Sequence, residues 1–278
     1  MNSGLASIAF GIVAALTWGA GDFSGGFATK RTNAYSVVIA AHLFSLGLLV
    51  AAALILQEPF PKADVWLWGA AAGLGAGVGL PLLYRALAEG HMSVAAPVSA
   101  LVAAGIPVAL SAVTVELPPV WVSLGLALAL AAIWLVSGGR ADVRLFDLRL
   151  PILAGIAFSI FFLTLHRASG ESILYPLIAV RLVSIPTLLA IARVSHQPVW
   201  PTRQALVPSL ISGLMDTLGN AAYALSAQLG RVDIAVVLGS LYPGSTVLLA
   251  WLLLRERISR QQLIGIATAL AAIVLITV

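Results

Sequence analysis

The sequence predicts an all-α integral membrane protein with about ten transmembrane helices, arranged as two inverted five-helix repeats. The composition, the recurrence of long apolar stretches and an internal repeat predict this fold class. Of the 278 residues, 60% are hydrophobic and only 9% are charged, and the mean hydropathy is +1.04. Soluble domains carry about 25% charged residues, so this chain lacks the polar surface that a water-soluble fold of this size requires.

Apolar stretches long enough to span a bilayer recur along the whole chain. A helix needs about 20 apolar residues to cross the hydrocarbon layer with every backbone group bonded internally. Charged and turn-forming residues, such as Lys30 to Asn33 and Arg140 to Arg149, separate these stretches. The predicted helices span residues 6–27, 35–57, 65–88, 92–115, 119–137, 150–167, 173–193, 205–228, 232–254 and 260–278.

The two halves of the chain resemble each other. With a shift of 140 residues, Glu116–Val136 aligns with Glu256–Ile276, and 9 of the 21 positions are identical, including the Glu and a Gly in register. We therefore predict two repeats, 1–139 and 140–278, of five helices each. An odd number of helices inverts the second copy in the membrane, which is a transporter architecture with its site near the midplane.

Several function classes are not supported by the residues. Cysteine is absent, which excludes disulfides and thiolate metal sites. The net charge of +4 comes from arginines at the ends of apolar stretches and is not a nucleic-acid footprint. The 11 acidic residues are scattered singly, so neither a catalytic cluster nor a metal site is predicted. We expect no enzyme activity, no cofactor and no nucleic-acid partner. The expected partners are the lipid bilayer and a small-molecule substrate. The expected oligomeric state is a monomer or homodimer.

Polar residues form a stripe along the predicted helix 205–228. They recur at three- and four-residue steps, which places them on one helix face. Because lipid offers no hydrogen bonds, such a stripe faces either a cavity or a neighbouring helix. We expect Asp216, Asn220 and Tyr223 to line a substrate path. The complete stripe is Ser209, Ser212, Asp216, Asn220 and Tyr223.

Three other ionisable residues lie within predicted helices, where each costs several kcal/mol by insertion scales. Arg181 either pairs with Asp216 or receives a substrate carboxylate through two hydrogen bonds. Asp22 is a candidate proton- or cation-binding carboxylate, with a position in interfacial water as the alternative. His42 is a candidate proton relay, because histidine titrates near neutral pH, or a histidine bonded between helices.

Aromatic residues and helix breakers complete the candidate site. Trp18 and Tyr242 either stack on a substrate or anchor the protein at the membrane interface. Tyr242-Pro243-Gly244-Ser245 interrupts the ninth predicted helix, and such interruptions mark binding sites in transporters. The i, i+4 pair Arg85 and Glu89 is expected to form a helix-end salt bridge. Four glycines are expected to allow close helix packing, namely Gly73, Gly75, Gly77 and Gly79.

Several short motifs occur within the predicted helices or at their ends, namely Trp18-Gly19, Ala86-Leu87, Tyr223-Ala224-Leu225, Pro243, Glu116 with Gly125, and Glu256 with Gly265. With these motifs, the sequence resembles the drug/metabolite transporter superfamily, in particular its EamA-type branch with ten helices. The resemblance implies a secondary transporter of a small polar metabolite, often an exporter of amino acids or related compounds, that works by alternating access. Proton coupling is one source of energy. The alternatives are a sugar or drug/cation permease of the same superfamily and a membrane-embedded enzyme.

The sequence gives two answers for the membrane orientation. The first, third, fifth, seventh and ninth loops hold 10 Lys and Arg residues, and the other loops hold 3. The positive-inside rule then places both termini outside the cytoplasm, whereas the family resemblance places them inside. In either orientation, we expect a multi-pass protein of the cell (inner or plasma) membrane.

Overall fold

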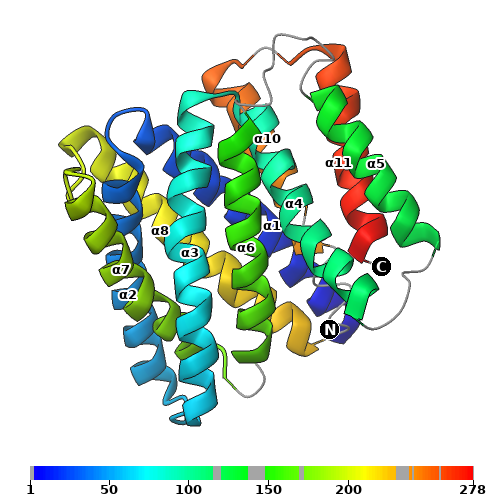
Figure 1. The fold of residues 1–278 in the computed structure, drawn as a ribbon. Helices are drawn as coiled ribbons and strands as arrows, with labels where there is room; N and C mark the ends of the chain where they lie inside the picture. The colour runs from blue at the N-terminus through cyan, green and yellow to red at the C-terminus, as the bar shows by residue number, and fades with distance from the viewer. Residues whose placement is uncertain are drawn as a thin grey trace.

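The described part of the chain, in a computed structural model, is helical and contains no strand. The structure describes residues 3–114, 120–136, 148–168, 172–229, 238–239, 241–256 and 258–277. The helices lie side by side, and the two chain ends lie at the same end of the molecule (Figure 1). The helices are α1 (Ser3–Thr29), α2 (Ala34–Leu56), α3 (Ala63–Glu89), α4 (Met92–Thr114), α5 (Val120–Val136), α6 (Arg149–Ala168), α7 (Leu174–Val194), α8 (Arg203–Leu229), α10 (Tyr242–Leu254) and α11 (Arg260–Thr277).

These helices confirm the predicted spans to within a few residues at most ends. The charged and turn-forming segments separate them, and Asn33 caps α2 by accepting a 2.9 Å hydrogen bond from the Ser36 backbone N–H. The ninth predicted helix, 232–254, is described only in part: α10 begins at Tyr242, with Pro243 in its first turn. Residues 232–237 lie outside the described residues, and so does Glu116 of the internal repeat.

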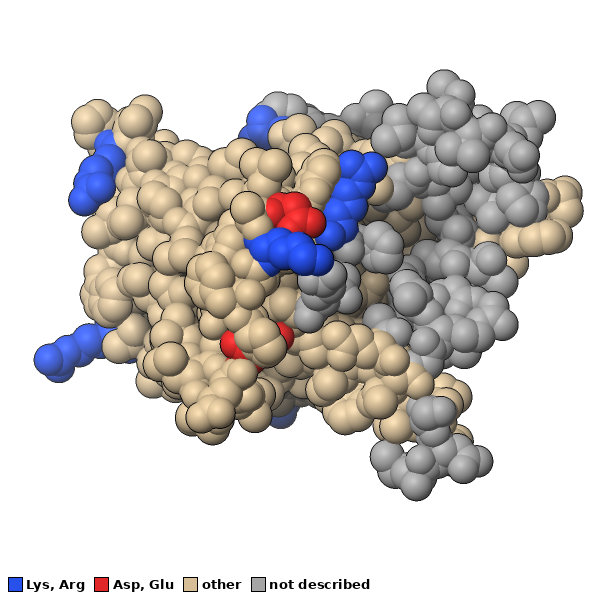
Figure 2. Space-filling view, turned by 90° about the horizontal axis from the view of Figure 1, so that it is seen from below, with Lys and Arg blue, Asp and Glu red and all other residues tan. Residues whose placement is uncertain are grey.

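Helix length and surface chemistry identify a multi-pass membrane protein. Within the described ranges, four helices are long and apolar enough to cross a membrane by length and composition, namely α1, α2, α3 and α7. Large apolar side chains lie exposed on the outer surface, for example Leu54, Leu67 and Leu253, where lipid rather than water suits them. Figure 2, which views the molecule from below, shows that the described residues on this face are largely uncharged, with a few scattered charged side chains.

The main helix contacts join the first half of the chain (1–139) to the second (140–278). In these contacts α1 packs on α8, α3 packs on α6 and α7, α2 packs on α7 and α8, and α5 packs on α11. Exchanging the two halves would convert the α1–α8 pair into the α6–α3 pair and leave the α2–α7 and α5–α11 pairs unchanged. This pattern is the one that two inverted repeats would produce. The repeats themselves, with their boundary at 139/140, remain a prediction.

The glycines of α3 allow close packing on two sides, as the sequence predicts. A Cβ atom at Gly73 would lie 2.7 Å from the Val180 carbonyl oxygen of α7. At Gly75 it would lie 2.8 Å from the Ala157 carbonyl oxygen of α6. Glycines therefore let α3 approach both α6 and α7, two helices of the second half.

Two carboxylates join the halves at opposite ends of the molecule. Glu58, after α2, accepts hydrogen bonds from the backbone N–H groups of Ile173 (2.8 Å) and Leu174 (3.1 Å) at the start of α7. At the other end, Glu256 accepts hydrogen bonds from the Ser93 hydroxyl group (2.9 Å) and the His91 ring (3.1 Å) at the start of α4. Each carboxylate therefore contacts the first turn of a helix from the other half.

Glu58→Ala is expected to destabilise the fold by about 1 kcal/mol, because it removes the acceptor for two N–H groups at a helix N-terminus. The measurement is thermal unfolding of the purified protein in detergent. Glu89→Gln is the matched control: Glu89 pairs with Arg85 at 2.6 Å, as predicted, but both side chains are 53% exposed and such a pair contributes little. Equal melting temperatures for the two variants would contradict a stabilising role for Glu58.

Candidate functional site

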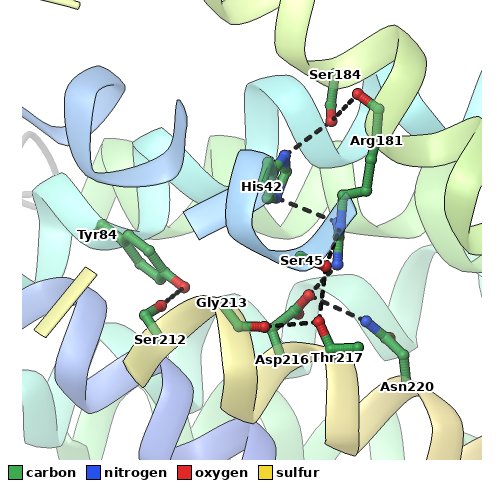
Figure 3. A network of polar contacts seen from close by, with 10 residues as sticks. All are labelled: His42, Ser45, Tyr84, Arg181, Ser184, Ser212, Gly213, Asp216, Thr217 and Asn220. Carbon is green, nitrogen blue, oxygen red and sulfur yellow. Dashed lines mark hydrogen bonds and ion pairs between the residues drawn. The ribbon is translucent and has the colours of Figure 1, made fainter. Parts of the chain in front are cut away.

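Arg181 is the centre of a polar network between α2, α7 and α8 (Figure 3). Its side chain is only 2% exposed, and it reaches from α7 to three partners. The guanidinium donates to Ser45 Oγ (2.9 Å) and to His42 Nε2 (3.2 Å) on α2. It also forms an ion pair with Asp216 on α8. Of the two roles that the sequence left open for Arg181, the structure shows the pairing with Asp216.

The network determines the hydrogen-bonding state of His42. Because arginine has only N–H donors, the Nε2 atom of His42 acts as the acceptor. The Nδ1 atom then carries the hydrogen and donates it to Ser184 Oγ at 2.8 Å. His42 is 1% exposed and neutral in this arrangement. A proton relay through His42 therefore requires Arg181 to move first.

A second chain of hydroxyl groups connects α2 to α8. Ser45 and Thr217 lie 2.7 Å apart, and the Thr217 hydroxyl group donates to the Gly213 carbonyl oxygen at 2.7 Å. Since the Thr217 hydrogen is used in this way, Ser45 donates to Thr217 while it accepts from Arg181. The hydroxyl groups of Ser45 and Thr217 thus both have partners, which makes the network rigid.

The predicted stripe of α8 serves both as a helix contact and as a cavity lining. Ser212 bonds to the Tyr84 hydroxyl group of α3 at 2.8 Å, and Ser209 donates to the Ala205 carbonyl oxygen of its own helix. Asn220 donates to Asp216 at 3.1 Å. Asp216 and Asn220 line the central cavity, whereas the two serines do not. The stripe therefore changes its role from contact to cavity along α8.

The central cavity lies between the two halves and has a volume of about 50 Å³. Six of the eight predicted site residues line it. Ala76, Leu80 and three phenylalanines from α6 complete the lining. The six predicted residues are Trp18, Asp22, Arg181, Asp216, Asn220 and Tyr242, and the phenylalanines are Phe158, Phe161 and Phe162.

Asp22 differs from the other charged residues of the cavity. Its residue is 8% exposed, so the carboxyl group is shielded from solvent on almost every side. Arg181 and Asp216 neutralise each other, but no hydrogen bond or ion pair reaches the Asp22 carboxyl group from any residue that the structure describes. The Asp22 carboxyl group is therefore available to a ligand.

Trp18 is the centre of an aromatic group on one side of the cavity. Its ring centroid lies 5.5 Å from that of Tyr223 and 6.4 Å from those of Tyr242 and Phe162. Tyr223 packs behind Trp18 and does not itself line the cavity, so its place on a substrate path stays a prediction. His42 is likewise absent from the lining, because it lies behind Arg181.

The start of α10 is joined to α1 beside this aromatic group. The Ser245 hydroxyl group donates to the Ala15 carbonyl oxygen at 2.8 Å, and the Thr246 hydroxyl group donates to the Gly19 carbonyl oxygen at 3.2 Å. These bonds position Tyr242 at the cavity. The helix interruption predicted at Tyr242 thus places an aromatic residue at the site.

The phenylalanines of α6 are the site residues that the sequence analysis missed. They stand in an apolar stretch, where nothing distinguishes a cavity-facing ring from a lipid-facing one. The internal repeat offered a signal, since the 140-residue shift aligns Trp18 with Phe158 and Asp22 with Phe162. Both phenylalanines line the same cavity as their counterparts.

Comparisons with known proteins agree with this architecture. Residues 148–278 match the model of the EamA-like transporter family. No curated protein matches the chain. In total, 23 chains of solved structures match. One of them, described only as the crystal structure of a protein, covers 97% of this chain and 96% of its own length with a TM-score of 0.66 and 20% sequence identity. This last similarity shows a shared fold.

Proposed function

We propose, from the match of residues 148–278 to the EamA-like transporter family of the drug/metabolite transporter superfamily, that the chain is a secondary active transporter that exports a small polar metabolite, such as an amino acid or a related compound. We place it in the plasma membrane, as a monomer or homodimer. The observation that carries the proposal is the cavity between the two halves, lined by Asp22, Arg181 and Asp216. Ionisable side chains at membrane depth are costly and mark substrate or ion pathways.

Alternating access is the proposed mechanism. A cavity of about 50 Å³ holds only a few water-sized molecules, so a larger substrate requires movement of the surrounding helices. The contacts of Glu58 and Glu256 lie at opposite ends and both join the two halves. Breaking one of them while the other holds would open the cavity to one side of the membrane only. In this mechanism Asp216 and Asn220 contact the polar groups of the substrate.

A proton gradient is the proposed source of energy, with Asp22 as the proton-binding group. A carboxylate without a partner in a shielded cavity is unfavourable, and protonation neutralises it. The aromatic rings of Trp18 and Tyr242 would then contact the apolar part of the substrate. The Arg181 network remains intact in this state and fixes the position of Asp216.

The test is transport in proteoliposomes over a panel of amino acids, amines, sugars and cationic drugs, with and without an imposed pH gradient. We expect saturable flux of at least one compound, and a loss of about tenfold or more in Asp216→Asn, since the variant disturbs a buried charge-assisted network. Glu89→Gln, matched for insertion and distant from the cavity lining, is expected to transport normally. Undiminished flux in Asp216→Asn would remove Asp216 from the substrate path, and a folded protein without flux for any compound would contradict the transporter assignment.

A further inference from the structure

The charges that line the cavity do not balance. Arg181 contributes one positive charge, and Asp216, its ion-pair partner, contributes one negative charge. Asp22 adds a second carboxyl group to the same cavity and has no partner among the described residues. When all three groups are ionised, the lining carries one net negative charge.

A shielded carboxylate of this kind needs compensation. An ionised group without a counter-charge in a water-poor site is strongly unfavourable, so it takes up either a proton or a cationic ligand. The titratable and charged groups that face Asp22 are Tyr84 on α3, Arg181 on α7, Asp216 on α8 and Tyr242 on α10. The only cation among them, Arg181, is engaged with Asp216. A ligand cation is therefore the natural partner of the Asp22 carboxyl group.

The remaining walls suit the apolar body of such a ligand. Five of the lining residues are aromatic, with Trp18 and Tyr242 on α1 and α10 and three phenylalanines on α6. The negative faces of aromatic rings attract ammonium groups, and the rings also accept the flat apolar surface of an aromatic substrate. The cavity thus combines one unpaired carboxyl group with aromatic walls.

A substrate carboxylate, in contrast, finds no free partner. Arg181 is the only cationic residue among the described residues of the lining, and it already donates to Ser45, His42 and Asp216. To bind a substrate carboxylate, it would have to leave Asp216, whose side chain is only 20% exposed, without its ion-pair partner. A zwitterionic amino acid would therefore satisfy its ammonium group at Asp22 but not its carboxylate.

We infer that the cavity takes a monovalent organic amine with an aromatic or similarly flat apolar body, whose ammonium group binds the Asp22 carboxylate in place of a proton. This inference rests on the proposed transport function and narrows its substrate from amino acids and related compounds to the related amines, which are cations without a carboxylate. Because the same oxygen atoms hold either the proton or the ammonium group, binding of the amine releases a proton.

Three probes that share one ring test the inference. Phenethylamine is a cation, phenylalanine is a zwitterion and phenylacetate is an anion at neutral pH. Their binding to the purified full chain is measured by titration calorimetry in buffers of different ionisation enthalpy, which reports the protons released. The variants are Asp22→Asn and Asp22→Glu, and Glu89→Gln serves as the control.

We expect phenethylamine to bind saturably with proton release, and the other two probes to bind at least about tenfold more weakly. Asp22→Asn should weaken the binding of phenethylamine by about 10- to 100-fold, because one charge-assisted contact is lost, and it should abolish proton release. Asp22→Glu, which keeps the carboxyl group, should retain proton release. Melting temperatures establish that each variant is folded.

Two kinds of result would overturn the inference. One is binding of phenylalanine or phenylacetate as tight as that of phenethylamine, or binding that persists in Asp22→Asn. The other is the absence of phenethylamine binding to folded wild-type protein. Either result leaves the proposed function standing if another compound is carried across proteoliposomes, whereas failure of the proposed function is a lack of flux for every compound in the panel.

Discussion

Replacing Arg181 by methionine is expected to abolish transport and to destabilise the protein by about 3 kcal/mol, the low end for breaking a buried ion pair, because the change leaves Asp216, whose side chain is 20% exposed, without a counter-charge. The same change removes the donor to Ser45 and the donor to His42. Methionine keeps much of the apolar volume of the side chain, so the effect reports the lost charge and hydrogen bonds. Transport in proteoliposomes and thermal unfolding in detergent measure the two losses.

A second variant separates stability from function in this experiment. In Arg181→Met combined with Asp216→Leu, both charges are absent, and replacing a buried pair by apolar side chains is often neutral for stability. The double variant should therefore recover much of the melting temperature but no transport. If the double variant is as unstable as Arg181→Met alone, the unpaired Asp216 charge is not the cause of the instability.

Gly213→Ala is expected to destabilise the contact between α2 and α8 by about 1–3 kcal/mol, as overpacking does in other proteins. The new Cβ atom would lie 2.3 Å from the Ala41 carbonyl oxygen and 2.9 Å from the Ala41 carbonyl carbon. These are backbone atoms, so the helices themselves must move apart. The movement would lengthen the Ser45–Thr217 hydrogen bond, which connects the same two helices. Transport should fall together with the melting temperature.

The control variant, Gly47→Ala, is expected to change the melting temperature in the opposite direction. Gly47 lies on α2, and a Cβ atom there would meet nothing within 4 Å. Alanine is favoured over glycine inside a helix by about 1 kcal/mol, so Gly47→Ala should leave transport unchanged and raise the melting temperature slightly. A similar change in both variants would show that the Gly213 contact with Ala41 is not specific.

The positions of the helices could be read from the sequence because a bilayer imposes a length and a polarity on each of them. The α8 stripe was equally readable, since an Asp and an Asn one turn apart stand out in an apolar helix. Six of the eight predicted residues line one cavity, and four of these six are charged or carry an amide group. Polar side chains at membrane depth need partners or a cavity, and both places lie inside the protein.

The contact partners of each residue could not be predicted from the sequence. Phe161 resembles any lipid-facing phenylalanine, because lipid and protein interior are equally apolar and composition does not separate the two faces. The place of His42 behind Arg181, rather than in the cavity, depends on how α2 meets α7. A shift of 139 residues aligns His42 with Arg181, but it contains no information about their 3.2 Å contact.

The pairing of α1 with α8 also has a consequence for biosynthesis. A chain is made from its N-terminus at roughly 5–20 residues per second, and about 200 residues separate the ends of α1 and α8, so α1 waits about 10–40 s for its neighbour. During that interval Ser7 lacks Ser226, with which it exchanges two hydrogen bonds in the finished protein. Until the second half of the chain has been synthesised, the insertion machinery or another early helix must contact the polar side of α1 and keep it away from lipid.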